Sequence, residues 1–141
     1  SIQINNSRFV EFLIDSIGDK MVGFIPHPDR DCVYREYYEC VAIGRIKTDE
    51  DKKKALDQLK RYKRAKLMPG SGLWAAGVFI RNMNHPRVRE FNKLWWDEII
   101  KGSFRDQLSL PYVLHKMGET PAKIDVNLWQ NEYFSCKKHL K

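Results

Sequence analysis

Cysteine is scarce in this chain of 141 residues, and long apolar runs are missing. Its three cysteines, Cys32, Cys40 and Cys136, are odd in number and lack CxxC spacing, which predicts neither a disulfide framework nor a zinc site. The longest apolar run covers residues 73–80, far below the ~20 residues that a membrane-spanning helix needs. No basic and apolar signal pattern opens the sequence. We therefore expect a water-soluble protein.

Positive charge is concentrated in one segment. The formal charge is +7 at pH 7, and residues 45–66 hold ten Lys/Arg against four Asp/Glu. This segment is either a solvated helix face or a site for an anionic partner such as a nucleic acid. Because Tyr62 is its only aromatic residue and the bases are spread around the helix, we favour the solvated face. We expect no nucleic-acid partner, and a basic nucleic-acid-associated module remains the alternative.

The order of the elements near the N-terminus favours an α/β fold. Residues 5–7 offer N-caps for a helix whose apolar side chains recur at helical spacing as far as Gly18. The helix lies between an extended segment at residues 1–4 and a buried-strand pattern at residues 20–27. A strand, helix and strand over this distance form a βαβ unit, which favours a mostly parallel sheet flanked by helices.

The rest of the chain continues as one mixed domain over residues 1–141, without a repeat or linker. The expected elements are a helix within residues 29–44, a charged helix over 48–65 begun by Thr48, a strand over 73–83, a helix from Pro86, a helix ending near Gly118, and one or two short strands within 122–136.

Three strong polar groups stand at the entrance of the otherwise apolar last helix: Arg105, Asp106 and Gln107. Ser103 can cap this helix with Asp106 as its third residue, which explains Asp106 alone. Pro111 conflicts with the carbonyl of Gln107, four residues earlier, so the helix should kink or begin late. Polar groups held in an irregular turn before a buried helix are typical of a cleft.

A second polar group follows the strand at residues 20–27. In open α/β sheets, ligands bind outside the carboxyl ends of the strands. The side chains that could project there are those of His27, Arg30, Tyr34 and Glu36. The alternative is that Asp29 or Asp31 caps the next helix while Arg30 pairs on the surface. The position after a strand favours the ligand role.

The glycine-rich segment at residues 69–77 is not a phosphate-binding P-loop, because no lysine follows the glycines and no strand precedes them. A loop that enters a buried strand explains most of this segment. Trp74 and Gly77 are the two residues that could form the floor and wall of a sugar or base site.

Three segments taken in order, "HPDRDCVYRE", "GLWAAGVFIRNMNHPRVREFNKLWWDEI" and "FRDQLSLPYVL", resemble consecutive signatures of a glycosyltransferase-like family. That family includes plant mucilage-related and TOD-type proteins, with relatives in bacteria and large algal viruses. The resemblance runs from about Ile2 to Leu114. It implies a GT-A-like, Rossmann-like fold, of which this chain would be the C-terminal, acceptor-side portion. "SIQI" at the start resembles the segment just after an acidic metal-binding DxD motif.

The resemblance also implies an activity and roles. The activity is transfer of a sugar from a nucleoside diphosphate, UDP by expectation, to a glycan hydroxyl with retention of configuration. Asp106 resembles the acidic residue that faces the donor sugar, with Arg105 and Gln107 beside it. Substrate would be bound by His27, Arg30, Tyr34, Glu36, Trp74 and Gly77. Family members often carry an acidic or hydroxyl residue where Ala75 and Ala76 stand.

A divalent metal, Mn²⁺ or Mg²⁺, is a further implication of the resemblance. Its main acidic ligands are expected upstream of residue 1, and His139 matches the late histidine that many GT-A enzymes supply to the metal. We expect a cytoplasmic location, or the host cytoplasm for a viral member, with a lumenal location as the alternative. A catalytically silent carbohydrate-binding domain is the other alternative function.

Overall fold

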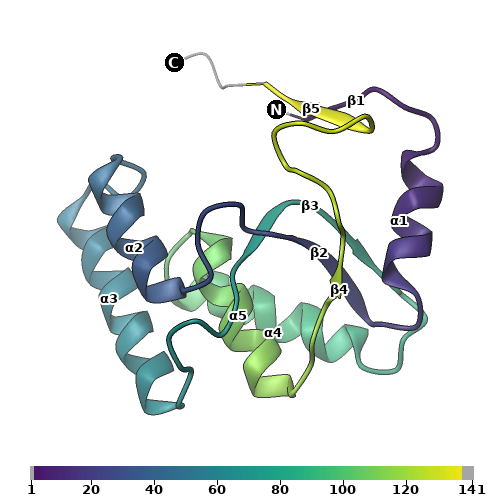
Figure 1. Cartoon of the computed structure of the whole chain (residues 1–141). Coiled ribbons are helices and arrows are strands. Elements are labelled where there is room, and N and C mark those ends of the chain that lie inside the picture. The colour runs from purple at the N-terminus through teal and green to yellow at the C-terminus, as the bar shows by residue number, and fades with distance from the viewer. Residues whose placement is uncertain (1, 138–141) are drawn as a thin grey trace.

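The central strand of the protein is β2 (Val22–Pro26), which has four buried residues out of five. In the computed structural model, which describes residues 2–137, β2 lies between β3 (Trp74–Arg81) and β4 (Ala122–Lys123) (Figure 1). The β2–β3 pair is antiparallel and the β2–β4 pair is parallel. Since β2 is buried on both faces, helices or other strands must cover each side of this sheet.

A second sheet forms from the two ends of the chain. Strand β1 (Ile2–Ile4) pairs antiparallel with β5 (Phe134–Cys136), which places the N-terminal segment beside the C-terminal one (Figure 1). The expected βαβ unit, with β1 parallel to β2, is therefore wrong. The physical reason is that β1 is three residues long with every residue exposed, so it lacks the burial of a strand inside a parallel sheet.

The mixed α/β class is confirmed, whereas the expected mostly parallel sheet is not found among the described residues. The longest ladder, between β2 and β3, is antiparallel and carries a bulge between Phe24 and Ile25. Figure 1 shows α1 (Phe9–Ile17) on one side of the sheet, while α4 (Val88–Lys101) and α5 (Asp106–Met117) cover the other. Helices α2 (Val33–Ala42) and α3 (Asp49–Arg64) stand together beyond the sheet.

The core divides into three clusters around these layers. One joins α2 and α3 to Leu108 of α5, the second joins Phe24 of β2 to α4 and α5, and the third joins Ile25 of β2 to α1 and β5. Adjacent residues of β2 thus face opposite sides of the sheet, as the strand pleat requires. No helix in the described part of the chain is both long and apolar enough to cross a membrane.

Helix α3 begins as the sequence predicts. The Thr48 hydroxyl oxygen accepts a hydrogen bond from the backbone N–H of Asp51 at 3.1 Å. Acidic residues fill the first turn and basic residues fill the last, which matches the partial charges of the two helix ends.

Helix α5 begins later than the Ser103 cap predicts, at Asp106. Ser103 is buried and acts before the helix, where its hydroxyl accepts the backbone N–H of Arg105 at 3.2 Å. A late start is one of the two outcomes expected from Pro111, which now lies well inside the helix. Asp106 is consequently the first helical residue rather than the third.

A buried polar network fixes the turn that leads into α5. Gln58 of α3 accepts the backbone N–H of Ser103 at 2.9 Å and donates to the Tyr62 hydroxyl at 2.6 Å. Tyr62 in turn donates to Glu98 of α4 at 2.8 Å, and Arg61 donates two hydrogen bonds to the same carboxylate, at 3.0 and 2.8 Å. Burial raises the pKa of Glu98, but the hydrogen bonds from Arg61 and Tyr62 outweigh burial, so its pKa is lowered overall.

Gly102 leaves no room for a side chain beside this network. A Cβ atom there would lie 2.5 Å from Cδ of Gln58, whose amide is already hydrogen-bonded on both sides. We expect Gly102→Ala to lower the free energy of unfolding by roughly 1–3 kcal/mol, the usual cost of overpacking. Denaturant unfolding measures this loss.

The matched control is a double-mutant cycle with Gln58→Ala. Shortening Gln58 removes the clashing atoms, so Gly102→Ala should cost less in that background. Equal stability of Gly102→Ala and the wild type would contradict this account of the turn.

Candidate active site

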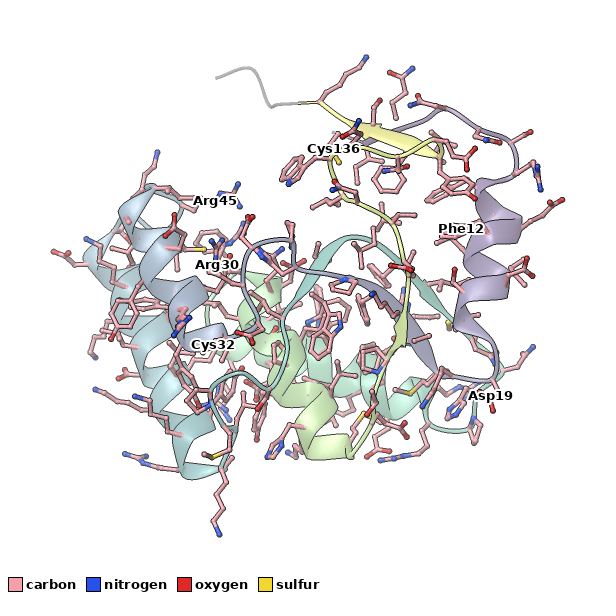
Figure 2. The ribbon with its side chains drawn as sticks, viewed as in Figure 1. Phe12, Asp19, Arg30, Cys32, Arg45 and Cys136 are labelled. Atoms are coloured by element: carbon pink, nitrogen blue, oxygen red, sulfur yellow. The ribbon has the colours of Figure 1, made fainter. Side chains whose placement is uncertain are left out.

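The candidate site lies where β2 ends and the chain turns toward α2. Because β2 and β4 are parallel, the loops that follow them leave the same edge of the sheet. Figure 2 shows Arg30 in the loop after β2 and Arg45 just past α2, near each other in the view. Three segments contribute side chains to the site: the β2–α2 loop, α2 and the turn before α5.

His27 is the first residue after β2, and its ring organises the loop. Its Nδ1 atom accepts the backbone N–H groups of Asp29 and Arg30, both at 3.2 Å. An accepting Nδ1 leaves the ring proton on Nε2, which lies 3.7 Å from Oε2 of Glu36. Burial lowers the pKa of His27, although Glu36 works in the opposite direction. His27 is thus a neutral ring that presents Nε2–H toward Glu36.

Glu36 is the buried centre of the cluster, with a relative exposure of 1%. Arg30 donates from Nε to its Oε2 at 2.7 Å, and Cys40 donates from Sγ to its Oε1 at 3.3 Å. Burial, followed by the Glu36 charge, raises the pKa of Cys40. Cys40 therefore remains a thiol that satisfies Glu36 and is poorly suited to act as a nucleophile.

Arg105 reaches the same cluster from the turn before α5. Its guanidinium lies close enough to Cys40 to act electrostatically on the thiol. One guanidinium nitrogen, Nη2, donates to Oε1 of Gln107 at 3.1 Å. Its Nε is buried and has no hydrogen-bond partner among the described residues. The structure thus brings Arg105 and Gln107 together with His27, Arg30 and Glu36.

Asp106 lies between Arg105 and Gln107 in the sequence and is half-buried. Its Oδ1 atom accepts the backbone N–H of Gln107 at 2.8 Å. Its backbone carbonyl accepts the indole N–H of Trp95 at 3.4 Å and the hydroxyl of Ser109 at 2.9 Å. The first turn of α5 is therefore fixed through the main chain, and the second carboxylate oxygen of Asp106, Oδ2, makes no hydrogen bond among the described residues.

Three other residues expected in the site lie elsewhere. Tyr34 is buried, and its hydroxyl donates to the carbonyl of Leu67 at 2.6 Å, so it anchors the segment after α3. Trp74 lines a small cavity of about 170 Å³ on the side of Pro111. Gly77 lies against Ile2: a Cβ atom added to Gly77 would be 3.3 Å from Cδ1 of Ile2. His139 lies outside the described residues.

Two members of the cluster were not anticipated from the sequence. Cys40 follows Glu36 by four residues, which is the helical spacing that brings side chains together, so this pair could have been found. Arg45 acts electrostatically on His27 from beyond the end of α2. Its proximity depends on the turn after the helix, for which the sequence gives no comparable signal.

The described residues contain no group of three or more His, Cys, Asp or Glu side chains that could hold a metal ion. The cluster around Glu36 is instead dominated by arginines. Its donors therefore fit an anionic ligand better than a divalent cation.

A mixed α/β domain with a cationic cluster at the ends of its strands is the architecture of many enzymes that bind phosphorylated substrates. The family model described as "TOD1/MUCI70, glycosyltransferase-like domain" matches residues 10–139, and the chain belongs to this family. Membership supports a general role in glycosyl transfer. No match was found among curated proteins or among solved structures.

Replacing the buried carboxylate at the centre of the cluster tests its structural role. Glu36→Gln would leave Arg30 without its charged partner, and breaking a buried pair in this way costs roughly 3 kcal/mol. We expect that loss in the free energy of unfolding. The control, Glu39→Gln on the same helix, should cost less than about 1 kcal/mol. Similar losses in the two variants would contradict the central position of Glu36.

The lowered pKa of His27 predicts a pH dependence of stability. Below pH 6.5 the unfolded chain takes up a proton at this position more readily than the folded one, so the free energy of unfolding falls as the pH is lowered. His27→Asn keeps an acceptor for the two loop N–H groups but cannot titrate. Its stability should therefore fall less steeply below pH 6.5.

Denaturant unfolding at several pH values measures how the free energy of unfolding changes with pH in the wild type and in His27→Asn. An unchanged slope in His27→Asn would contradict the assignment.

Proposed function

We propose that this domain transfers a sugar from a nucleoside diphosphate, UDP in the first instance, to a hydroxyl group of a glycan, with retention of anomeric configuration. The observation that carries the proposal is a pair of arginines after the end of β2: Arg30 binds the buried carboxylate of Glu36, and Arg105 acts on the Cys40 thiol that donates to the same carboxylate. Family membership supplies the reaction class.

The arginines would hold the diphosphate leaving group. Charge accumulates on this group as the bond to the sugar breaks, and fixed cations in a partly buried site stabilise it strongly. Arg105 offers a guanidinium whose Nε is unused by the described residues. Glu36 has a positioning role, because it fixes Arg30 and satisfies the thiol of Cys40.

Asp106 would act on the sugar itself. A carboxylate near the anomeric carbon stabilises the positive charge that develops there, or orients the sugar hydroxyls. Its place between Arg105 and Gln107 would set it beside the leaving group. His27 would keep the β2–α2 loop in place beside the substrate, through the two backbone N–H groups that its Nδ1 accepts.

A GT-A-like architecture and a requirement for Mn²⁺ or Mg²⁺ belong to the proposal through the family resemblance. The described residues contain no group of three or more His, Cys, Asp or Glu side chains that could hold this ion. When bound, such an ion would offset charge on the diphosphate. The arginine cluster would contribute to the same task from this chain.

The decisive test is a screen of UDP- and GDP-sugars, each with Mn²⁺ or Mg²⁺, on the protein with any flanking sequence its gene encodes. We expect thermal stabilisation and slow donor hydrolysis with a UDP-sugar. Asp106→Asn should lower kcat by roughly 10²–10³ because it removes a charge that acts in the transition state. NMR of the product reports the anomeric configuration.

The matched control is Asp97→Asn, an exposed carboxylate on α4 that pairs with Lys93 at 2.6 Å. This variant should keep the wild-type rate. Unchanged turnover in Asp106→Asn would remove Asp106 from the chemistry. Absence of binding and hydrolysis across the whole donor panel would favour a silent carbohydrate-binding domain.

A further inference from the structure

A second cationic site lies between α3 and the C-terminal end of α4. It is a hollow of about 360 Å³, and its lining is strongly basic. Five of the lining side chains are cations and one is a carboxylate: Lys54, Lys60, Arg61, Arg64, Lys101 and Asp57. A substantial part of the excess positive charge of the chain therefore gathers at one concave place, rather than being spread evenly over the α3 surface.

Two of the five cations are available to a ligand. Arg61 is engaged by Glu98, while Lys60 and Lys54 make exposed pairs with carboxylates of α3 itself. Arg64 and Lys101 have no ion-pair partner in the described part of the chain and are exposed. Exposed pairs within a helix are weak, so a bound anion could also recruit Lys54 and Lys60.

Helix capping accounts for only part of this charge. Arg64 and Lys101 lie in or next to the last turns of their helices, where they offset about half a negative charge at each helix end. Lys54 and Lys60 lie further back along α3, outside its last turn. The cations around the hollow therefore exceed what the two helix ends require.

The shape and chemistry of the hollow select a compact ligand. Its volume falls within the range of small-molecule sites. None of its lining residues is aromatic, so nucleic-acid bases would find no ring to stack on. From the clustered cations and the limited volume we infer that this hollow binds a soluble, compact anion with two or more negative charges, of the diphosphate type.

The hollow is separate from the candidate active site, but Gln58 connects the two. Gln58 and Gly102 form part of its lining, and Gln58 accepts the backbone N–H of Ser103. Ser103 accepts the backbone N–H of Arg105, whose side chain points to the cluster around Cys40. An anion in the hollow would therefore contact the turn that positions Arg105. The inference does not depend on the transferase proposal.

Isothermal titration with inorganic pyrophosphate tests the site on the unmodified chain and on Arg64→Gln/Lys101→Gln. We expect saturable binding that weakens at least tenfold in this double variant and weakens with added salt. The control, Lys53→Gln/Lys116→Gln, removes the same charge at exposed positions outside the hollow and should change affinity less than twofold. Thermal unfolding verifies that both variants are folded.

Three results would overturn the inference. The first is the absence of saturable pyrophosphate binding to the wild-type chain. The second is an equal loss of pyrophosphate affinity in the two double variants, which would indicate a diffuse charge effect. The third is binding that survives Arg64→Gln/Lys101→Gln and is lost in Arg30→Gln, which would assign the anion to the candidate active site instead.

Discussion

The buried carboxylate of Glu36 is the interaction on which the candidate site depends. A charge removed from water is tolerated only when hydrogen bonds and opposite charges replace its hydration. Arg30 and Cys40 provide those partners, and the His27 ring faces the same oxygen that Arg30 binds. The β2–α2 loop is therefore fixed against α2 by a buried anion that one cation, one thiol and one neutral imidazole surround. Arg45 and Arg105 add positive charge next to the Arg30–Glu36 pair, through their effects on His27 and Cys40.

The turn before α5 is held by a separate buried network from α3 and α4. Gln58 fixes the backbone at Ser103, and Ser103 fixes the backbone at Arg105. Trp95 holds the first turn of α5 through the carbonyl of Asp106. Because these contacts use main-chain atoms, the side chains of Arg105 and Gln107 remain free to meet at the site. Structural and ligand-facing roles are thus divided between backbone and side chain.

The sequence predicted the helices well and the strand pairing poorly. The Thr48 cap, the acidic first turn and the basic last turn of α3 are local signals, and they predicted the position of this helix correctly. The partner of β1 depends on β5, more than 120 residues later, and a three-residue exposed strand carries no pattern that specifies it. Arg61 and Glu98 are 37 positions apart, so their pairing was equally invisible in the sequence.

The site itself was only partly accessible to sequence reasoning. The strand-end rule and the family resemblance selected His27, Arg30, Glu36, Arg105 and Gln107, which the structure brings together. Tyr34 looked equally suitable, but its hydroxyl is used by the carbonyl of Leu67, a contact 33 residues away. Trp74 and Gly77 lie on the same strand, but the ladder with β2 is interrupted between them. Trp74 lines a cavity beside Pro111, whereas Gly77 lies against the side chain of Ile2.

The most direct measurement of the central claim is NMR chemical-shift mapping of the isotopically labelled protein as UDP and Mg²⁺ are added. The account predicts the largest amide shifts at residues 27, 29 and 30, at Glu36 and Cys40, and at residues 105–107. Shifts confined to other surfaces, with these amides unchanged at saturation, would contradict the assignment of the Glu36 cluster as the ligand site.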